Sequence, residues 1–457
     1  MRGATRGAGL IFASVWAVCC MNPASRLPNR RPDPMSADTL MKTATFHHGV
    51  HPEEYKELTC HLASKVLPLP QVVALPLQQH IGAPTQALVA KGDQVRTGQK
   101  IADADSYVTS PIHASVTGEV LEVAPFPHPL GGRVPMIRIK RTAEEDDWDL
   151  LERPEYWERA EVDTLRKLVR EAGIVGLGGA AFPTHVKMAP PGDKPVDTFI
   201  LNGCECEPYL TCDHRGMLEQ TGKILTGMAI ILKMLGIQRG YIGVERNKLD
   251  AIAALEKHIR DLNLPFRVLP LKVKYPQGAE KMLIDAALGR KVPAGGLPMD
   301  VGVVVNNVGT ALAVQEAVVE GKPLIQRMIT VTGEGVKAPR NLVTRLGTPF
   351  QDLIDACGGL QDETAQVFMG GPMMGLAQYD LQVPTLKATS GIVALTDQHV
   401  QRARTYPCIQ CGSCVSACPM NLVPTTLARL AEKGRWPESD DWGVFSCIEC
   451  GSCAFVC

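Results

Sequence analysis

The first part of the chain has the hydrophobic pattern of short strands. Between residues 46 and 141 the apolar runs are brief, and glycine turns separate them. The segment 72–76 is apolar. In the segment 115–120, two β-branched residues precede a glycine turn, and the chain then returns toward a second strand. Short strands at close spacing with glycine turns predict a small all-β barrel or sandwich.

Residues 91–101 read KGDQVRTGQKI, which resembles the biotinyl/lipoyl-type barrel-sandwich fold. Carriers with that fold need a lysine at a hairpin tip to hold their cofactor, and the comparable turn at 111–114 has none. We therefore expect residues 42–142 to form a barrel-sandwich domain that is a docking scaffold and not a swinging arm, with His113 as a structural residue.

The pattern changes after an acidic connector at 144–148. Apolar residues at 162, 165, 168 and 169 share one helical face. Strand-length runs at 196–201, 240–244, 266–273 and 301–305 then alternate with helical patterns at 216–235, 247–262 and 278–288. This alternation predicts a Rossmann-like α/β domain with a mainly parallel sheet over 150–327. Ligands of such sheets bind outside the carboxyl ends of the strands.

From 328 to 395 the pattern returns to strands, with one short helix at 351–356, and a small β-grasp (SLBB-like) domain fits it. Residues 396–457 form the last predicted domain, in which a helix at 425–433 lies between two cysteine blocks. The fold class is therefore multidomain α/β plus β.

The two cysteine blocks, CIQCGSCVSAC at 408–418 and CIECGSCAFVC at 447–457, share the spacing C-x-x-C-x-x-C-x-x-x-C. Thiolate is the soft ligand of iron–sulfur clusters, and this spacing is typical of 4Fe–4S sites. In two-cluster ferredoxins the fourth cysteine of each run binds the other cluster. We therefore assign one cluster to Cys408, Cys411, Cys414 and Cys457 and the other to Cys418, Cys447, Cys450 and Cys453.

Zinc knuckles are the alternative, although zinc sites do not require three cysteines spaced three residues apart together with a fourth cysteine from the other block. Because the assignment makes the last residue given, Cys457, a ligand, we expect the functional protein to continue beyond it.

The composition limits the possible partners and the compartment. A length of 457 residues suits roughly three domains of ~150 residues each. The net charge of −1 gives no electrostatic case for nucleic acid or for an anionic membrane surface. Reduced cluster cysteines imply a reducing compartment. We expect residues 1–41 to be a disordered extension or a misassigned start; the alternative is a working secretory signal, because arginines precede an apolar run at 10–20.

A glycine-rich stretch, GLGGAAFPTHVK at 176–187, follows the first helical pattern. Glycines let the backbone approach a phosphate or a flat ring, and successive N–H groups can form an anion nest. Two predicted strands end in polar residues: Asn202, Glu205 and Glu207 follow the first, and Asn306 and Asn307 follow the last. Asparagine amides suit the edge of an isoalloxazine ring or a nicotinamide. A plain loop and simple turn formation are the alternatives.

These segments resemble the flavin-binding subunit of respiratory complex I. The resemblance implies that FMN is cradled and NADH admitted, with Asn202, Glu205 and Glu207 beside the flavin and nicotinamide and Asn306 and Asn307 touching FMN. The implied cradle consists of Gly176, Gly178, Gly179, Ala180, Phe182 and Lys187. The chain departs from that family at Cys204 and Cys206. A metal site there would need a converging partner, and Cys212 is the nearest candidate.

The order of all four domains resembles the RnfC (RsxC) family, the peripheral subunit of ion-translocating ferredoxin:NAD oxidoreductase complexes. Supporting segments over about 42–457 include QHIGAP, CECEPYLTCDHR, YPQGAEK and GGPMMG. The related cobalamin reductase carries its barrel toward the other end, and the related subunit of the sodium-pumping quinone reductase lacks the cluster cysteines.

The resemblance implies an electron-transfer subunit with two 4Fe–4S clusters, FMN and NAD(H), in which hydride chemistry belongs to the cofactor. It also implies membrane subunits and a ferredoxin-type carrier as partners, with peripheral attachment at the cytoplasmic face of the inner membrane. The alternative is a non-catalytic iron–sulfur relay in which the α/β domain only docks.

Overall fold

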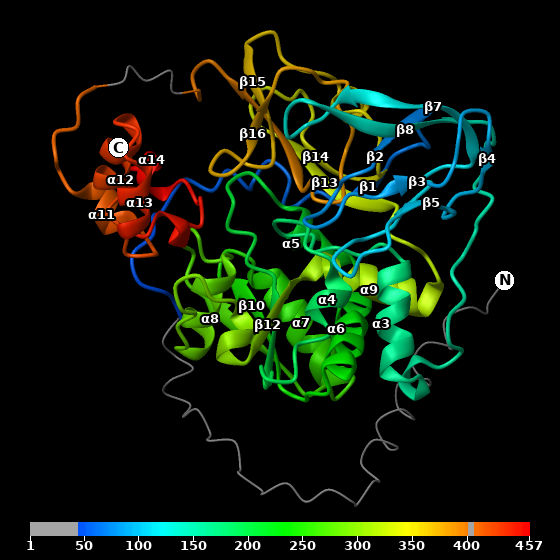
Figure 1. The fold of residues 1–457 in the computed structure, drawn as a ribbon, viewed down its shortest axis with the longest axis horizontal. Helices are drawn as coiled ribbons and strands as arrows, with labels where there is room; N and C mark the ends of the chain where they lie inside the picture. The colour runs from blue at the N-terminus through cyan, green and yellow to red at the C-terminus, as the bar shows by residue number, and fades with distance from the viewer. Residues whose placement is uncertain (1–43, 401–405) are drawn as a thin grey trace, which may run out of the picture.

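A computed structural model describes residues 44–400 and 406–457. The extension predicted at 1–41 lies outside these residues. Figure 1 shows the α/β domain in green at the bottom, the barrel-sandwich strands in cyan at the upper right, a mixed sheet in gold at the top and the cysteine blocks in red at the left. The predicted fold class is confirmed.

The barrel-sandwich domain is made of two small antiparallel sheets. The first sheet has the order β2 (Val72–Pro76), β8 (Arg133–Arg141), β7 (Gly118–Pro127) and β4 (Gln94–Val95), and the second has the order β3 (Gln86–Ala87), β5 (Lys100–Asp103) and β6 (Ile112–His113). His113 is buried, and burial lowers its pKa to about 3. The turn that would carry a cofactor in a swinging arm is therefore buried, which fits a scaffold.

Residues 44–66 do not join the sheets of the barrel-sandwich domain. Ala44 bridges to Leu271 and Val50 to Tyr275, and β1 (Lys65–Val66) extends the mixed sheet by pairing with β14 (Arg340–Arg345). This segment therefore crosses the α/β domain and reaches the mixed sheet before the barrel begins.

The α/β domain has a parallel sheet of order β11 (Phe266–Leu271), β10 (Gly240–Glu245), β9 (Thr198–Asn202) and β12 (Val303–Asn307). Its apolar core is continuous with that of the barrel-sandwich domain. The helices and 3-10 turns of this domain are η1 (Trp157–Arg159), α3 (Val162–Glu171), α4 (Thr184–Lys187), α5 (Cys212–Glu219), α6 (Thr221–Leu235), α7 (Leu249–Asp261), α8 (Glu280–Leu288), η2 (Pro298–Val301) and α9 (Val308–Glu320).

Two helical expectations were wrong or incomplete. The single helix predicted at 216–235 is two helices, α5 and α6, because Gln220 has non-helical dihedral angles. The Thr221 hydroxyl donates to the Met217 carbonyl and so competes for the acceptor of the helical ladder. Helix α9 was not predicted. Its residues are buried on most sides, and a helix that is apolar all round has no amphipathic period to detect.

The mixed sheet forms the third domain. Its order is β1, β14, β13 (Gln326–Thr332), β17 (Gly391–Thr396), β15 (Thr364–Met369) and β16 (Leu376–Gln378), and α10 (Phe350–Ala356) packs against it. The cysteine domain consists of α11 (Ser413–Ala417), α12 (Pro424–Glu432), α13 (Trp436–Asp441), η3 (Val444–Ser446) and α14 (Ser452–Phe455). Among the described helices, none combines the length and apolar character needed to cross a membrane.

Helices α6 and α9 cross at Gly227, and this contact generates a prediction. A Cβ atom at Gly227 would lie 1.8 Å from the Ala311 carbonyl oxygen, so the helices must separate to accept it. We expect Gly227→Ala to lower the free energy of unfolding by about 1–3 kcal/mol. Urea unfolding followed by circular dichroism measures this change.

The matched control is Gly222→Ala on the same helix, where an added Cβ meets nothing within 4 Å. This variant should be unchanged or up to about 1 kcal/mol more stable, because alanine favours the helix. Equal effects of the two substitutions would contradict the close crossing.

Candidate functional site

The site is built around the carboxyl ends of two neighbouring strands. Strands β9 and β12 are parallel, and their last residues, Asn202 and Asn307, are register partners. Asn307 also caps α9, because its side-chain oxygen accepts the N–H of Gly309 at 2.7 Å. The two predicted polar strand ends therefore lie side by side, as the parallel sheet requires.

The glycine-rich stretch forms a closed loop beside these strand ends. The N–H of Gly176 donates to the Phe182 carbonyl at 2.9 Å, and the N–H of Leu177 donates to the Thr310 hydroxyl at 2.9 Å. At Gly178 a Cβ atom would lie 2.8 Å from the Asn307 amide nitrogen, whereas at Gly179 it would meet nothing. The loop therefore packs on Asn307 through Gly178 and leaves Gly179 open. It ends at α4, which carries Lys187.

Lys187 already has partners in the chain. Its ammonium group donates to the Glu280 carboxylate and, at 3.2 Å, to the Val305 carbonyl in the middle of β12. These contacts hold the loop against the strand end and against the start of α8. A role for Lys187 with a phosphate stays a prediction.

The three polar residues after β9 have different surroundings. The Asn202 amide donates to the Gly278 carbonyl at 2.8 Å. The Glu205 carboxylate accepts the N–H groups of Asp213 and His214, so it caps the start of α5. Glu207 instead accepts the N–H groups of Met373 and Met374 in the mixed-sheet domain, and burial raises its pKa. Asn202 and Glu205 thus border the strand ends, and Glu207 lies at a domain junction.

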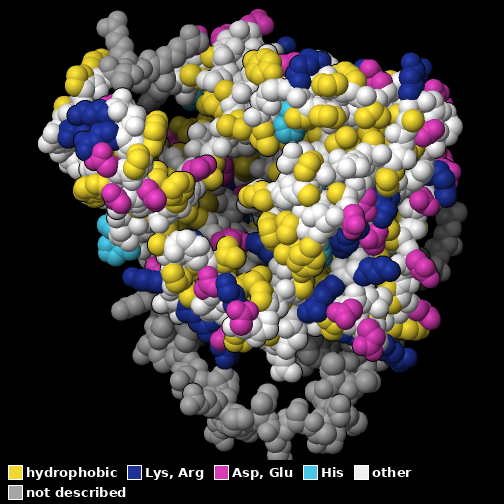
Figure 2. All heavy atoms as spheres, in the orientation of Figure 1, with side chains coloured by type: hydrophobic (Ala, Val, Ile, Leu, Met, Phe, Trp, Pro, Cys, Tyr) yellow, Lys and Arg dark blue, Asp and Glu magenta, His cyan; other side chains and the backbone are white. Residues whose placement is uncertain are grey.

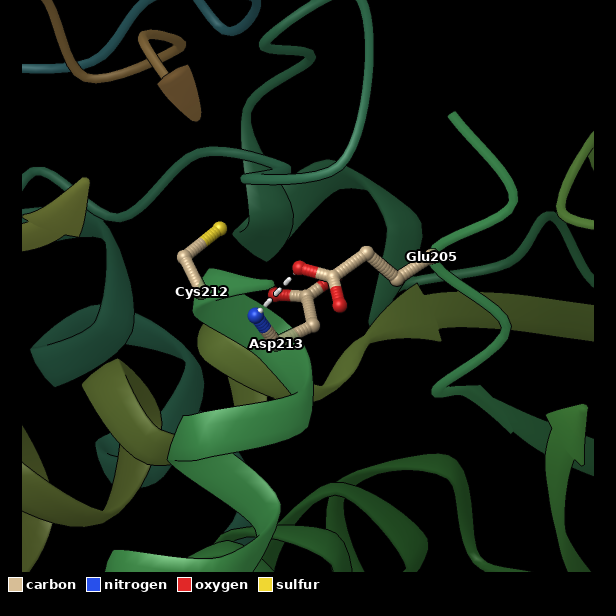
Figure 3. Close-up of side chains that lie close together, drawn as sticks. All are labelled: Glu205, Cys212 and Asp213. Carbon is tan, nitrogen blue, oxygen red and sulfur yellow. Dashed lines mark hydrogen bonds between the residues drawn. The ribbon is translucent and has the colours of Figure 1, made fainter. Parts of the chain in front are cut away.

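Asp213 belongs to the site and was missing from the residues predicted for it. Its carboxylate accepts the Asn307 amide N–H at 2.6 Å, and burial followed by the Glu205 charge raises its pKa to about 7. Figure 3 shows the two carboxylates together, with the Asp213 N–H bonded to Glu205. The available signal was its position directly after CECEPYLTC, in the first turn of a helix.

These contacts form a ring. It runs by contacts from Gly178 to Asn307, Asp213 and Glu205, along the chain from Glu205 to Asn202, by a hydrogen bond to Gly278, and along the chain to Glu280, which binds Lys187. Three buried side chains on these segments, Asn306, Thr184 and Gln277, have polar atoms without a hydrogen-bond partner among the described residues. Buried polar atoms are normally paired, so their state indicates a missing polar ligand or water. Together with the open Gly179 and the helix terminus at Asn307, this set fits a phosphate-bearing flavin.

Cys204 and Cys206 do not converge with Cys212 on a group of metal-ligating atoms among the described residues. The buried Cys204 and the partly buried Cys206 do not belong to the group in which Glu205, Cys212 and Asp213 bring ligand atoms within 4.8 Å of one another. Burial raises the pKa of the Cys206 thiol to about 12 and that of Cys212 well above its usual value. Both Glu205 carboxylate oxygens already accept backbone N–H groups at the start of α5. The arrangement is therefore that of a capped helix with protonated thiols.

Two buried lysines hold the loop that carries Glu205 and Glu207. Lys56 donates to the carbonyls of Glu205, Glu207 and Leu210, and Lys248 donates to the carbonyl of Cys204. Burial lowers the pKa of Lys56. Lys56 lies far from this loop in sequence, and no local pattern signals such a contact.

The two cysteine blocks have matching loops. Gln410 and Glu449 occupy the same position of the repeat with φ of 58° and 53°, and Gly412 and Gly451 follow with φ of 80° and 76°. Backbone N–H groups point at sulfur in both blocks: Gln410 donates to Cys408 at 3.4 Å, and Glu449 donates to Cys447 at 3.3 Å. Such N–H···S bonds are typical of cluster-binding loops. Helices α11 and α14 of the two blocks pack together. The crossed ligation stays a prediction.

The cysteine domain docks on the loops beside the strand ends. The Tyr275 hydroxyl donates to the Cys450 carbonyl at 2.7 Å, and the Gly49 N–H donates to the Ala417 carbonyl at 3.1 Å. Val50, Tyr275, Ala417 and Cys450 form one buried apolar cluster. One chain therefore places a predicted flavin cradle and a cluster-binding repeat on either side of residues 275–278.

Four family models match the chain in the predicted order. Residues 44–144 match the RnfC barrel sandwich hybrid domain, and residues 169–316 match the Nuo51 FMN-binding domain. Residues 328–377 match the SLBB domain, and residues 399–457 match the 4Fe-4S dicluster domain. FMN and 4Fe–4S clusters are thus the cofactors of the matching domain families.

Curated relatives match over most of the chain. A subunit of the proton-translocating ferredoxin:NAD(+) oxidoreductase complex of Clostridium ljungdahlii is 46% identical over 87% of this chain and 86% of its own. Its counterpart in the Na(+)-translocating complex of Acetobacterium woodii is 45% identical over 88% of this chain and 90% of its own. An NAD+-reducing [NiFe]-hydrogenase in the H2-reduced state has a TM-score of 0.48 at 18% identity, over 65% of this chain and 61% of that chain. The chain belongs to the RnfC family, whose members are subunits of ion-translocating ferredoxin:NAD(+) oxidoreductase complexes.

Proposed function

We propose that this chain passes electrons between NAD(H), FMN and two 4Fe–4S clusters, as a subunit of an ion-translocating ferredoxin:NAD oxidoreductase complex. One observation carries the proposal. The ring of contacts around Asn202, Asn307 and the glycine-rich loop, and the docked cysteine repeat, share the segment 275–278. A site for two-electron chemistry thus lies next to a site for one-electron carriers.

The residues of the ring have separate tasks. The open backbone at Gly179 would face a phosphate, with Lys187 as the nearby cation. The amides of Asn306 and Gln277, which lack a hydrogen-bond partner in residues 44–400 and 406–457, are available to a flavin or nicotinamide edge. The Glu205 and Asp213 carboxyl groups lie beside Asn307. Bound FMN supplies the conversion between two-electron and one-electron transfer.

The electron balance matches the two cysteine blocks. The cysteines of the two blocks would hold two 4Fe–4S clusters, each able to accept one electron when bound, which would match the two electrons and one proton that NADH gives up in becoming NAD+. The reverse direction consumes two electrons from the clusters and a proton to form NADH. A ferredoxin-type carrier and the other subunits of the complex are the partners on the cluster side.

Membrane attachment and ion coupling belong to the complex. We propose peripheral attachment through partner subunits at the cytoplasmic face of the inner membrane. The chain is about equally similar to a relative named for proton translocation and to one named for Na+ translocation. This similarity favours a choice of ion by other subunits.

Anaerobic titration with NADH tests the function. We expect purified protein to hold stoichiometric FMN and eight iron atoms for its two clusters, and NADH to bleach the flavin and reduce the clusters in electron paramagnetic resonance (EPR). Iron without FMN, together with clusters that dithionite reduces but NADH does not, would instead support the non-catalytic relay.

Lys187→Glu should weaken FMN binding by about tenfold or more, because it replaces a charge-assisted contact to phosphate with a repulsive one. FMN content after dialysis and the Kd from flavin fluorescence measure the change. Lys281→Glu makes the same charge change one residue from Glu280, where Lys281 contacts the Pro293 carbonyl. It should keep FMN, and unchanged FMN in Lys187→Glu would refute the phosphate role.

Cys418→Ala tests the crossed ligation. The crossed assignment places Cys418 with Cys447, Cys450 and Cys453, so this variant should lose the EPR signal that Cys450→Ala loses. Cys411→Ala provides the reference for the other cluster, because Cys411 belongs to it whether or not the fourth ligands cross. A loss of the Cys411-type signal would show that each block binds its own cluster.

A further inference from the structure

The Asn307 side chain is held at both ends of its amide. Its oxygen accepts the N–H of Gly309 at 2.7 Å, and its nitrogen donates to the Asp213 carboxyl group at 2.6 Å. A flipped amide would place its nitrogen against the Gly309 N–H, so the hydrogen-bond network assigns the nitrogen to the side of Asp213. Asn307 is 9% exposed, which leaves its side chain little room to turn.

The fixed amide has one donor left. An amide nitrogen carries two N–H groups, and Asp213 accepts one of them. No second acceptor bonds to the Asn307 nitrogen within residues 44–400 and 406–457. Figure 2 shows the surface hollowed between the cysteine domain, the lobe at the left, and the rest of the molecule, near the place where Figure 1 labels α5. The remaining N–H therefore suits an acceptor atom of a ligand, such as a carbonyl oxygen of an isoalloxazine ring.

Asp213 reaches Asn307 because Glu205 caps the helix that carries it. The Glu205 carboxylate accepts the N–H of Asp213 at 2.7 Å and the N–H of His214 at 3.1 Å, in the first turn of α5. The first N–H groups of a helix have no partner within the helix, so such a cap stabilises its start. Figure 3 shows the carboxyl groups of Glu205 and Asp213 close together. The cap thus fixes the turn from which the Asp213 side chain projects.

The bond to Asn307 does not require a charged Asp213. Burial, followed by the charge of Glu205, raises the pKa of Asp213 to about 7. The nearby cations Lys248 and Arg327 act in the opposite direction and only limit the rise. Asp213 is therefore partly protonated near neutral pH, and a protonated carboxyl group still has an acceptor oxygen. An asparagine at this position would have the same shape and an acceptor oxygen, without a charge.

We propose that Asp213 is a positioning residue of the flavin site and acts through Asn307. Glu205 fixes the first turn of α5, and Asp213 in that turn holds the Asn307 nitrogen. Asn307 then turns its remaining N–H toward an acceptor atom of the bound flavin. What Asp213 supplies is an acceptor oxygen and not a charge. The inference rests on the proposed function and deepens it, because it names what directs the amide that recognises the flavin.

Asp213→Ala and Asp213→Asn test this role in the full chain. Asp213→Ala removes the acceptor, and we expect the Kd for FMN to rise about three- to tenfold, the equivalent of one hydrogen bond. Asp213→Asn keeps an acceptor oxygen, so its Kd should stay within about twofold of wild type. Flavin fluorescence measures both values after bound FMN has been dialysed away, and urea unfolding measures stability.

The matched control is Asp250→Ala. The Asp250 carboxylate bonds to His214 Nε2 at 2.7 Å, so it anchors the next residue of α5 instead of Asn307. This variant should lose stability and keep the wild-type Kd for FMN. Equal increases of the Kd in Asp213→Ala and Asp250→Ala would show that loosening of α5 is the cause, and would overturn the positioning role.

Asn307→Ala completes a double-mutant cycle. If Asp213 acts only through Asn307, the double variant should bind FMN as weakly as Asn307→Ala alone. Two independent losses that multiply would contradict this route. If Asp213→Ala does not fold, Asp213→Leu takes its place, since leucine has a similar shape and no acceptor.

The remaining outcomes separate this role from the function. A wild-type protein that takes up no FMN would refute the proposed function. FMN binding by the wild type together with an unchanged Kd in Asp213→Ala would refute the positioning role alone. A Kd in Asp213→Asn as high as that in Asp213→Ala would show that the charge of Asp213 matters and not its acceptor oxygen, which also overturns the proposal.

Discussion

Buried cations bonded to backbone carbonyl groups hold the domains of this protein together. The Lys387 ammonium, on the mixed-sheet domain, donates to the Pro111 carbonyl of the barrel-sandwich domain and to the Gly173 carbonyl of the α/β domain, both at 2.7 Å. Burial lowers its pKa to about 7. A buried charge is expensive unless hydrogen bonds satisfy it, so these bonds form only when all three domains are in place. The junction is therefore a cooperative one.

Buried cations bonded to backbone carbonyl groups also position the candidate flavin site. The Arg327 guanidinium donates to the carbonyls of Leu177 and Lys387, so it ties the glycine-rich loop to the mixed sheet. Lys56 fixes the carbonyls of Glu205 and Glu207 in the same way. A carbonyl group belongs to the backbone, so these bonds fix the path of the loops and leave their side chains available. A flavin site and a cluster site that must exchange electrons gain from such rigidity, because their separation is then set by the fold.

The sequence predicted what local pattern and spacing can encode. The strand-end residues Asn202 and Asn307 were found because apolar runs mark strands and parallel strands align their ends. The cysteine spacing marked the cluster loops directly. Lys56 and Arg327 were missed, since their partners lie far away in the chain and a lone lysine or arginine carries no signal of its acceptor. Glu207 was grouped with Glu205, although the fold turns it toward Met373. Helix α9 was missed because burial on all sides removes the periodicity.

The two cysteine blocks show most clearly which features the local sequence sets and which the surrounding fold sets. Their shared sequence dictates the left-handed residues at Gln410 and Glu449 and the N–H···S bonds that follow. It does not dictate that Cys450 is buried while Cys411 is exposed. Solvent exposure and hydrogen bonding help to set the reduction potential of an iron–sulfur cluster. One repeated sequence therefore lies in two unlike surroundings, and the difference at the second cysteine resides in Tyr275 and Met373, which contact Cys450 and Gly451.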